Sequence, residues 1–244
     1  MPEQLWVTEL LNHALAGPVD GLLRAFGILP KYPQAPITNA VAMQIVVFAF
    51  LVIVFALVRS RLSVDNPGAL QHIFEGVHGF INGQSEEIIG HHSSQYTPYL
   101  AALGYFILIS NLLGLIPGFE SPTGASPTVP LGCAVLSFLY YHAQGFKHSG
   151  IKYLKHFAGP MPLLAPLMIP IETISHLARM LSLTIRLYAN MFAGDMVTLV
   201  FFSLVPIGIP ILFLGLHIGV SFLQTYIFVL LVTVYLQGAV ATEH

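Results

Sequence analysis

Charged residues are scarce in this sequence. Only 8% of the 244 residues are charged, with nine Lys or Arg and eleven Asp or Glu, whereas soluble domains carry about 25%. Hydrophobic residues make up 55%, and the mean hydropathy is +0.77. So few charges cannot cover the surface of a soluble domain of this size. The composition excludes a soluble globular enzyme, a nucleic-acid binder and a disordered tail, and it predicts an integral membrane protein.

Cysteine and the usual catalytic motifs are also missing. Cys133 is the one cysteine, which excludes an internal disulfide framework and a multi-cysteine metal site. Gly-rich phosphate loops, Ser/His/Asp arrangements and zinc spacings do not occur, so we expect no enzyme activity and no cofactor. The pair His91-His92 has no second cluster to support a metal, and a solvated loop is the favoured interpretation. The N-terminus lacks a basic region before a short apolar core, so we expect no cleavable signal peptide.

Long apolar runs dominate what is present. A spanning helix needs about 20 apolar residues to cross about 30 Å of hydrocarbon. The runs that predict membrane helices are 40–58, 98–116, 127–143, 167–205 and 211–240. The Pro and Gly residues of 206–210 separate the last two runs, since both residue types end helices. We expect one all-α membrane domain over 1–244, with about five membrane helices and no internal repeat.

The last two helices are too long for simple spans. At 1.5 Å per residue, 167–205 would measure about 58 Å and 211–240 about 45 Å. A helix perpendicular to a core of about 30 Å cannot use that length, so both are expected to be strongly tilted, bent or projecting. Four prolines between 160 and 170 crowd the start of the first one.

Between the first two spans, 68–92 has the pattern of an amphipathic helix. Its apolar positions are Leu70, Ile73, Phe74, Val77, Phe80 and Ile81. This spacing of three and four residues predicts a helix lying on the membrane surface rather than a span. A shorter surface helix is expected around 5–15.

Lys and Arg placement predicts the orientation. The basic residues that follow the first and third spans are Arg59, Arg61, Lys147, Lys152 and Lys155. Cytoplasmic loops carry such an excess, so the N-terminus is expected outside and the C-terminus in the cytoplasm. Arg24 and Lys31 on the outer side are the competing observation.

Four charges in the last two segments are the candidate functional residues. Between 157 and 242 the charged residues are Glu172, Arg179, Arg186 and Asp195. An ionisable group at membrane depth costs about 2.5–3.5 kcal/mol by insertion scales, so each one implies function by default. Arg186 has no acid within one helical turn, and a guanidinium stays protonated. Its counter-charge is therefore expected from elsewhere, such as another chain.

Helical geometry sorts these charges by face. At 100° per residue, Glu172, Arg179 and Arg186 are seven apart and form one stripe. Asp195 lies nine residues after Arg186, or 180° around the helix. His217 on the final helix is seven residues from Gln224 and is expected opposite Asp195. A carboxylate and an imidazole at that depth can pass a proton.

Each candidate also has a purely structural interpretation. Arg179 near a helix end can snorkel to the interface, and Glu172 can pair with Arg179 or His176. His176 is more typical of an interfacial polar residue than of a ligand, and His217 alone is typical of a satisfied buried histidine. The residues that can serve as interhelical hydrogen-bond partners are Asn111, Asn190, Ser182 and Gln224.

The stretch SLTIRLYANMFAGD (Ser182 to Asp195) resembles the signature of subunit a of F-type ATP synthases. Three further stretches fit the same family: ISNLLGLIPG from Ile109, PIETISHLARMLSL from Pro170 and LQTYIFVLLVTVYL from Leu223. The order and spacing around one intramembrane Arg make the resemblance specific. Two positions depart from the family pattern. Gly114 stands where some members carry a carboxylate, and the acid at 195 is Asp rather than Glu.

The resemblance implies a stator subunit of the F0 sector. Its two long tilted helices would face a rotating c-ring of small hairpin subunits, and its partners would include peripheral stalk b subunits, the lipid bilayer and transported protons. Arg186 falls where the family faces the ring carboxylates. The positions implied for the outer half-channel are Asp195, Asn190, His217 and Gln224. Those implied towards the cytoplasmic exit are Glu172, Ser175 and Arg179, and Ser182 and Asn111 complete the candidate proton-translocation residues. A bacterial plasma membrane is implied as the location.

Two other functions are open from the residues alone. A proton-coupled secondary transporter would need a central substrate pocket and usually an internal repeat. A membrane assembly or structural protein would not need Arg186, Asp195 and His217 at membrane depth. Co-purification with a ring of small hairpin subunits would separate all three.

Overall fold

The structure is a computed structural model that describes residues 4–25, 27, 32, 35–63, 68–90, 93–116, 118–150, 153, 165–204 and 209–240. Within those residues every regular element is helical. The α-helices are α1 (Trp6–Ala25), α2 (Asn39–Ser60), α3 (Ala69–Ile89), α4 (Thr97–Leu113), α5 (Pro122–Ala125), α6 (Thr128–Ser149), α8 (Ala165–Leu204) and α9 (Ile209–Val240). A 3-10 turn, η1 (Ser93–Gln95), precedes α4.

Most helix limits lie within three residues of those expected from the apolar runs. The helix expected at 127–143 extends to Ser149, because aromatic and polar side chains do not end a helix. Gly150 ends it, with a φ of 56° and a backbone N–H that bonds to the carbonyl of Phe146. The helix expected around 5–15 also continues further, to Ala25. Of the break expected at 206–210, Ile209 and Pro210 already belong to α9. Residues 206–208, the pair His91-His92 and Lys152 and Lys155 lie outside the described residues.

Three helices are long and apolar enough to cross a membrane among the described residues, namely α2, α8 and α9. α4 is apolar but has only 17 residues. The side chains of α2 show why a bilayer is needed. Its buried residues lie between Ala40 and Leu51, while Phe48, Ile53 and Leu57 are at least half exposed. Exposing these apolar side chains to water would be unfavourable, whereas exposing them to lipid is not.

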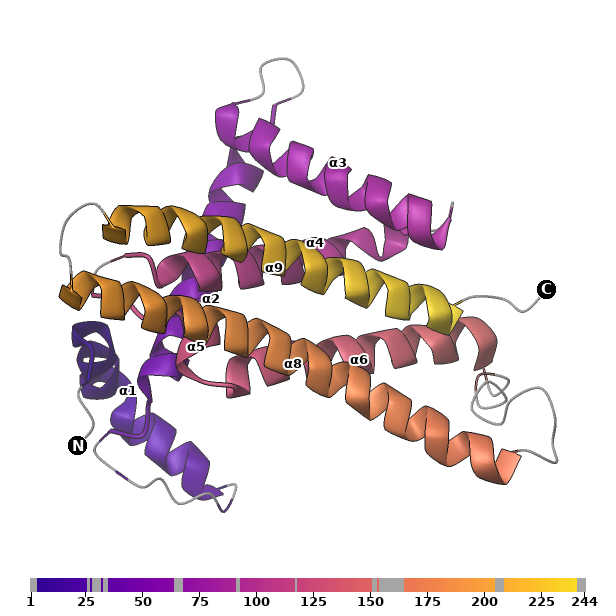
Figure 1. Ribbon diagram of the computed structural model, residues 1–244, viewed down its shortest axis with the longest axis horizontal. Coiled ribbons are helices and arrows are strands. Elements are labelled where there is room, and N and C mark those ends of the chain that lie inside the picture. Colours follow the sequence, from indigo (N-terminus) through magenta and orange to yellow (C-terminus); the bar gives the residue numbers. More distant parts are fainter. Residues whose placement is uncertain are drawn as a thin grey trace.

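The core lies between α4, α6, α8 and α9. α8 and α9 run side by side along the long axis of the molecule (Figure 1). The most deeply buried apolar side chains there are Leu100, Ile107, Leu187, Met191, Val232 and Leu236. α4 approaches α9 closely at Gly104, where an added Cβ would lie 3.3 Å from Val229. A Cβ at position 104 would require the Val229 side chain to move by a few tenths of an ångström.

α2 runs at a steep angle to α8 and α9 (Figure 1). Its 22 residues measure about 33 Å, which matches the thickness of a bilayer core. The 40 residues of α8 measure about 60 Å, twice that thickness. A bilayer that α2 crosses directly would therefore be crossed obliquely by α8 and α9, as their length requires.

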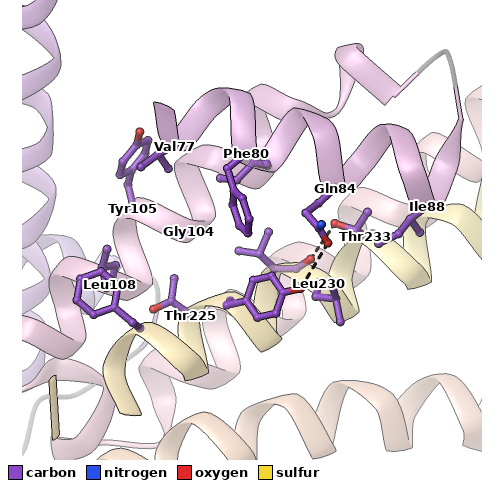
Figure 2. A pocket seen from close by; sticks show the side chains of 14 residues that line it. Val77, Phe80, Gln84, Ile88, Gly104, Tyr105, Leu108, Thr225, Leu230 and Thr233 are labelled. Atoms are coloured by element: carbon purple, nitrogen blue, oxygen red, sulfur yellow. Dashed lines mark hydrogen bonds between the residues drawn. The ribbon is translucent and has the colours of Figure 1, made fainter. Parts of the chain in front are cut away.

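The amphipathic segment forms α3, which packs on α4 and α9. Val77 and Ile81 face these helices, whereas Leu70, Ile73 and Phe80 remain more than half exposed. An apolar crevice of about 190 Å³ lies between the three helices. Figure 2 shows this crevice and the hydrogen bond between Tyr226 Oη and Gln84 Oε1, which measures 3.4 Å.

α1 is fixed to the start of α2 by one side chain. Asn12 Nδ2 donates to the carbonyl of Ile37 at 3.0 Å, and Asn12 Oδ1 accepts from the Ile37 N–H at 3.0 Å. Both residues are buried, and Val7 and Met43 pack beside them. The amide satisfies two backbone groups in a place where water does not reach.

Replacing this amide is expected to loosen α1. Asn12→Ala leaves two buried backbone groups unpaired, at a cost of about 1–3 kcal/mol each. Thermal unfolding of the purified protein in detergent should show a lower Tm. His13→Ala, on the exposed side of the same helix, should leave the Tm unchanged. Equal Tm values for both variants would contradict this role of Asn12.

Candidate functional site

Asp195 and His217 face each other across the α8–α9 interface. Asp195 Oδ1 lies 3.7 Å from His217 Nε2, a distance within the range of an ion pair but too long for a hydrogen bond. The imidazole is 3% exposed, whereas the carboxylate is 33% exposed. Nε2 has no hydrogen-bond partner among the described residues. The carboxylate therefore has access to its surroundings, and the imidazole lies behind it.

Two glycines allow this arrangement. An added Cβ on Gly194 would lie 3.0 Å from His217 Nδ1, so the ring rests directly on the backbone of α8. An added Cβ on Gly124 would lie 2.6 Å from Asp195 Oδ2, so α5 abuts the carboxylate from the other side. The site has no space for larger residues at either position.

A cavity of about 580 Å³ reaches this pair. Its wall comes from α8, α9, α5 and the segment between α4 and α5. The polar residues in the wall are Glu120, Ser121, Asp195, Thr198 and His217. The volume is ample for several waters, since one water occupies about 30 Å³ of liquid. The cavity gives Asp195 access to its surroundings, although most of its wall is apolar.

Sequence reasoning missed Glu120. Glu120 lies nine residues after Asn111. Only the turn before α5 brings it into the cavity wall that contains Asp195. The family pattern has a carboxylate at the position of Gly114 in some members. A Cβ there would lie 2.7 Å from Ser121 Cβ, so Gly114 leaves no space for that acid.

Asn111 belongs to a buried hydroxyl network beside the cavity. Its Oδ1 accepts from Thr123 Oγ1 at 2.6 Å, and Thr123 Oγ1 lies 2.8 Å from Ser121 Oγ. Ser121 Oγ also donates to the carbonyl of Ser110 at 3.2 Å. The network joins α4 to α5 and holds Gly124 against Asp195. Asn111 thus has the structural role of hydrogen-bond partner and lies near the site as well.

Arg186 lies on a different face of α8. It is exposed, as is its neighbour Ile185, whereas Leu183 and Leu187 are buried against the core. The structure gives the guanidinium no ion pair within the described part of the chain. An unpaired cation on an apolar surface is unfavourable in lipid, so this face of α8 is expected to meet a counter-charge from another chain.

Glu172 and Arg179, which share a helical stripe with Arg186, have separate partners. Glu172 Oε1 lies 3.3 Å from His176 Nε2, so the carboxylate pairs with the histidine and not with Arg179. The Arg179 guanidinium lies over the ring of Tyr235, 5.3 Å from its centroid. It therefore turns inward towards α9 and does not snorkel outward. His176 is buried.

The remaining candidates differ in exposure. Gln224 is buried on the same face of α9 as His217, with Ser221 between them. Asn190 and Ser175 are half-buried on α8, and Ser182 is exposed. The structure thus brings together Asp195, His217 and the Asn111 network, and it separates them from Arg186 and from Glu172. Within the described residues no three His, Cys, Asp or Glu side chains gather as a metal site would require.

Comparisons with known proteins agree on one family. A family model described as ATP synthase A chain matches residues 40–237. ATP synthase subunit a of Koribacter versatilis (strain Ellin345) is 56% identical over 245 residues, which cover 100% of both chains. That of Solibacter usitatus (strain Ellin6076) is 52% identical over 96% of this chain and 100% of its own length. That of Geotalea uraniireducens (strain Rf4) is 39% identical over 82% of this chain and 88% of its own length.

The cavity predicts a difference in reactivity between two threonines of α8. Thr198 lines it, whereas Thr184 is 5% exposed, and both hydroxyls donate to the carbonyl four residues earlier. In membrane vesicles, Thr198→Cys should react with a small water-soluble thiol reagent, and Thr184→Cys should not. Cys133 is buried and provides a low background. A Thr198→Cys variant that reacts no faster than Thr184→Cys would contradict selective access of water through the cavity.

Proposed function

The chain belongs to the ATP synthase A chain family, and we propose that it provides two half-channels through which protons reach and leave a rotating ring. Family membership makes it a multi-pass membrane subunit of the F0 sector, which carries out proton transport for ATP synthesis. The proposal concerns how its residues take part. The observation that supports it best is the cavity that reaches Asp195 and His217, with Arg186 unpaired on another face of the same helix.

The outer half-channel follows from the cavity. Protons enter past Glu120 and reach Asp195, whose carboxylate is partly exposed to the cavity and partly enclosed by Gly124 and His217. A carboxylate beside an imidazole can accept a proton and pass it on. The proton then neutralises a ring carboxylate, which enters lipid because a neutral acid costs far less there than an ion.

Arg186 separates the two half-channels. When a protonated ring carboxyl returns after almost a full turn, the guanidinium favours its ionised form and promotes release of the proton. A proton that moves directly between the half-channels meets the same fixed positive charge and is repelled. The membrane potential supplies about 2.3 kcal/mol per charge per 100 mV for the cycle. The chain itself is not catalytic in this scheme, and nucleotide chemistry belongs to a separate soluble sector.

The proposed partners follow from the uncovered surfaces. The c-ring would contact the face of α8 that carries Arg186, and peripheral stalk b subunits and lipid would cover other apolar faces, such as that of α2. We place the N-terminus outside and the C-terminus in the cytoplasm of a bacterial plasma membrane. Arg59 at the end of α2 and Lys147 at the end of α6 support this orientation.

Arg186→Ala tests the proposal directly. ATP-driven proton pumping into inverted vesicles should be abolished, because no cation then promotes release from the ring. Assembly, measured as co-purification with the ring, should remain, since the Arg186 side chain is not part of the core. Arg61→Ala, at the end of α2, is the control and should pump normally. Normal pumping by Arg186→Ala would disprove the proposed function.

Asp195→Asn tests the outer half-channel. The amide keeps the shape but cannot carry a proton, so pumping and passive proton flux should fall by about 10²-fold. No leak should open, because Arg186 is unchanged. The control is Asp20, which forms an ion pair with Arg24 on α1. Asp20→Asn should change neither the pumping rate nor the passive flux. Unchanged rates for Asp195→Asn would remove this residue from the path.

A further inference from the structure

Tyr141, His176 and Glu172 form a series between α6 and α8, in which a hydrogen bond joins the first two and an ion-pair contact joins the last two. Tyr141 Oη lies 2.9 Å from His176 Nδ1, and His176 Nε2 lies 3.3 Å from Glu172 Oε1. Tyr141 is 3% exposed and His176 is 9% exposed, whereas the Glu172 side chain is 33% exposed. The series therefore begins at an accessible carboxylate and ends at a buried hydroxyl.

The series lies on the opposite side of Arg186 from the Asp195 cavity. Glu172 precedes Arg186 by 14 residues, about 21 Å along the helix axis, and Asp195 follows it by nine, about 14 Å. Arg186 is thus between the two titratable groups along α8. If the Asp195 cavity gives access from one side of the membrane, Glu172 lies towards the other.

The contacts fix where the hydrogens lie when Glu172 is ionised. A carboxylate only accepts, so His176 Nε2 must carry the hydrogen that points to Glu172. Nδ1 of the neutral ring is then an acceptor, and Tyr141 Oη donates to it. All three side chains have their partners in this state.

The three side chains can take up one more proton while the contacts between them remain. A proton that arrives at Glu172 can remain on the carboxyl, which then donates to Nε2 while Nδ1 carries the ring hydrogen. It can also reside on the ring, which then donates from both nitrogens to Glu172 and Tyr141. Either way Tyr141 Oη changes from donor to acceptor, and both contacts persist.

The surrounding charges limit the series to one additional proton. Within the described part of the chain, the titratable or charged groups around His176, from α6, α8, α9 and the residue at 153, are Tyr141, His142, Tyr153, Glu172, Arg179 and Tyr235. Arg179 opposes a second positive charge nearby, and Glu172 compensates the first. The His142 ring lies 4.9 Å from that of His176 and disfavours protonation of both rings together.

We propose that Tyr141 and His176 position the Glu172 carboxylate and hold a proton in transit, as part of the half-channel on the cytoplasmic side. This rests on the proposed function above. His176 and Tyr141 act through Glu172 and are positioning residues. Their substitution should alter how proton transfer depends on the pH of that side, which a purely packing role would not do.

Two variants separate proton holding from positioning. His176→Gln can still donate to Glu172 and accept from Tyr141 but cannot gain a proton. Tyr141→Phe removes one hydroxyl and preserves the ring packing. The measurement is the rate of ATP-driven pumping by the complete complex in inverted vesicles, where protons are taken up from the bath at the cytoplasmic face. It is made between about pH 5 and about pH 8, the range in which a histidine titrates.

The wild type should show a step in rate within this pH range, where the series gains its proton. His176→Gln should lose that step and pump roughly tenfold more slowly on its acidic side. Tyr141→Phe should keep the step but move it to lower pH, because the protonated ring has lost an acceptor. Tyr140→Phe, whose ring stacks on Tyr99, is the matched control and should behave as the wild type.

Two results would overturn the proposal. Wild-type rates and pH profiles in both variants would show that the series carries no proton. Failure of Tyr141→Phe to co-purify with the ring would show that it only joins α6 to α8. Arg186→Ala in the same vesicles distinguishes this from failure of the proposed function, because that variant should be inactive whatever the result at Tyr141 and His176.

Discussion

The cost of placing charge in hydrocarbon governs the arrangement of α8. An isolated ion at membrane depth is unfavourable by several kcal/mol, so each ionisable group needs a partner, a polar cavity or a second chain. Asp195 has His217 and the cavity, Glu172 has His176, and Arg179 has the ring of Tyr235. Arg186 has none of these within the described chain. The same rule that explains three contacts therefore requires a counter-charge from outside for the fourth residue, and a ring of carboxylates would provide it.

The proposed proton path depends on two glycines. Gly194 lets the His217 ring rest on the backbone of α8, and Gly124 lets α5 approach Asp195. The Asn111 network fixes α5 in that position. The site is therefore enclosed by backbone on two sides, which leaves the carboxylate few alternative positions. Restricted geometry of this kind favours proton transfer, because donor and acceptor do not need to reorganise.

Much of the fold could be predicted from the sequence, since apolar runs such as 40–58 have few other possible structures. The opposite placement of Arg186 and Asp195 followed from helical periodicity alone. Other features depend on how helices pack, which periodicity does not determine. His176 pairs with Tyr141 only because α6 lies along α8, and Glu120 reaches the cavity only through the turn before α5. The length of α6 was underestimated because its polar end resembles an interface, although Gly150 is what ends it.

The supports of α8 also have a mechanical consequence. α6 contacts α8 before Arg186, at His176, and α5 contacts it after Arg186, at Met191 and Asp195. α9 also packs on α8 and diverges from it towards the start of α8 (Figure 1). Arg186 stands near the middle of this 40-residue helix, between those supports. If a rotor pushes sideways on Arg186, α8 is supported on both sides of that point. The force would pass into α6 and α5 rather than bend the helix. Stiffness at the point of contact would then convert proton steps into torque with little lost to deformation of the stator.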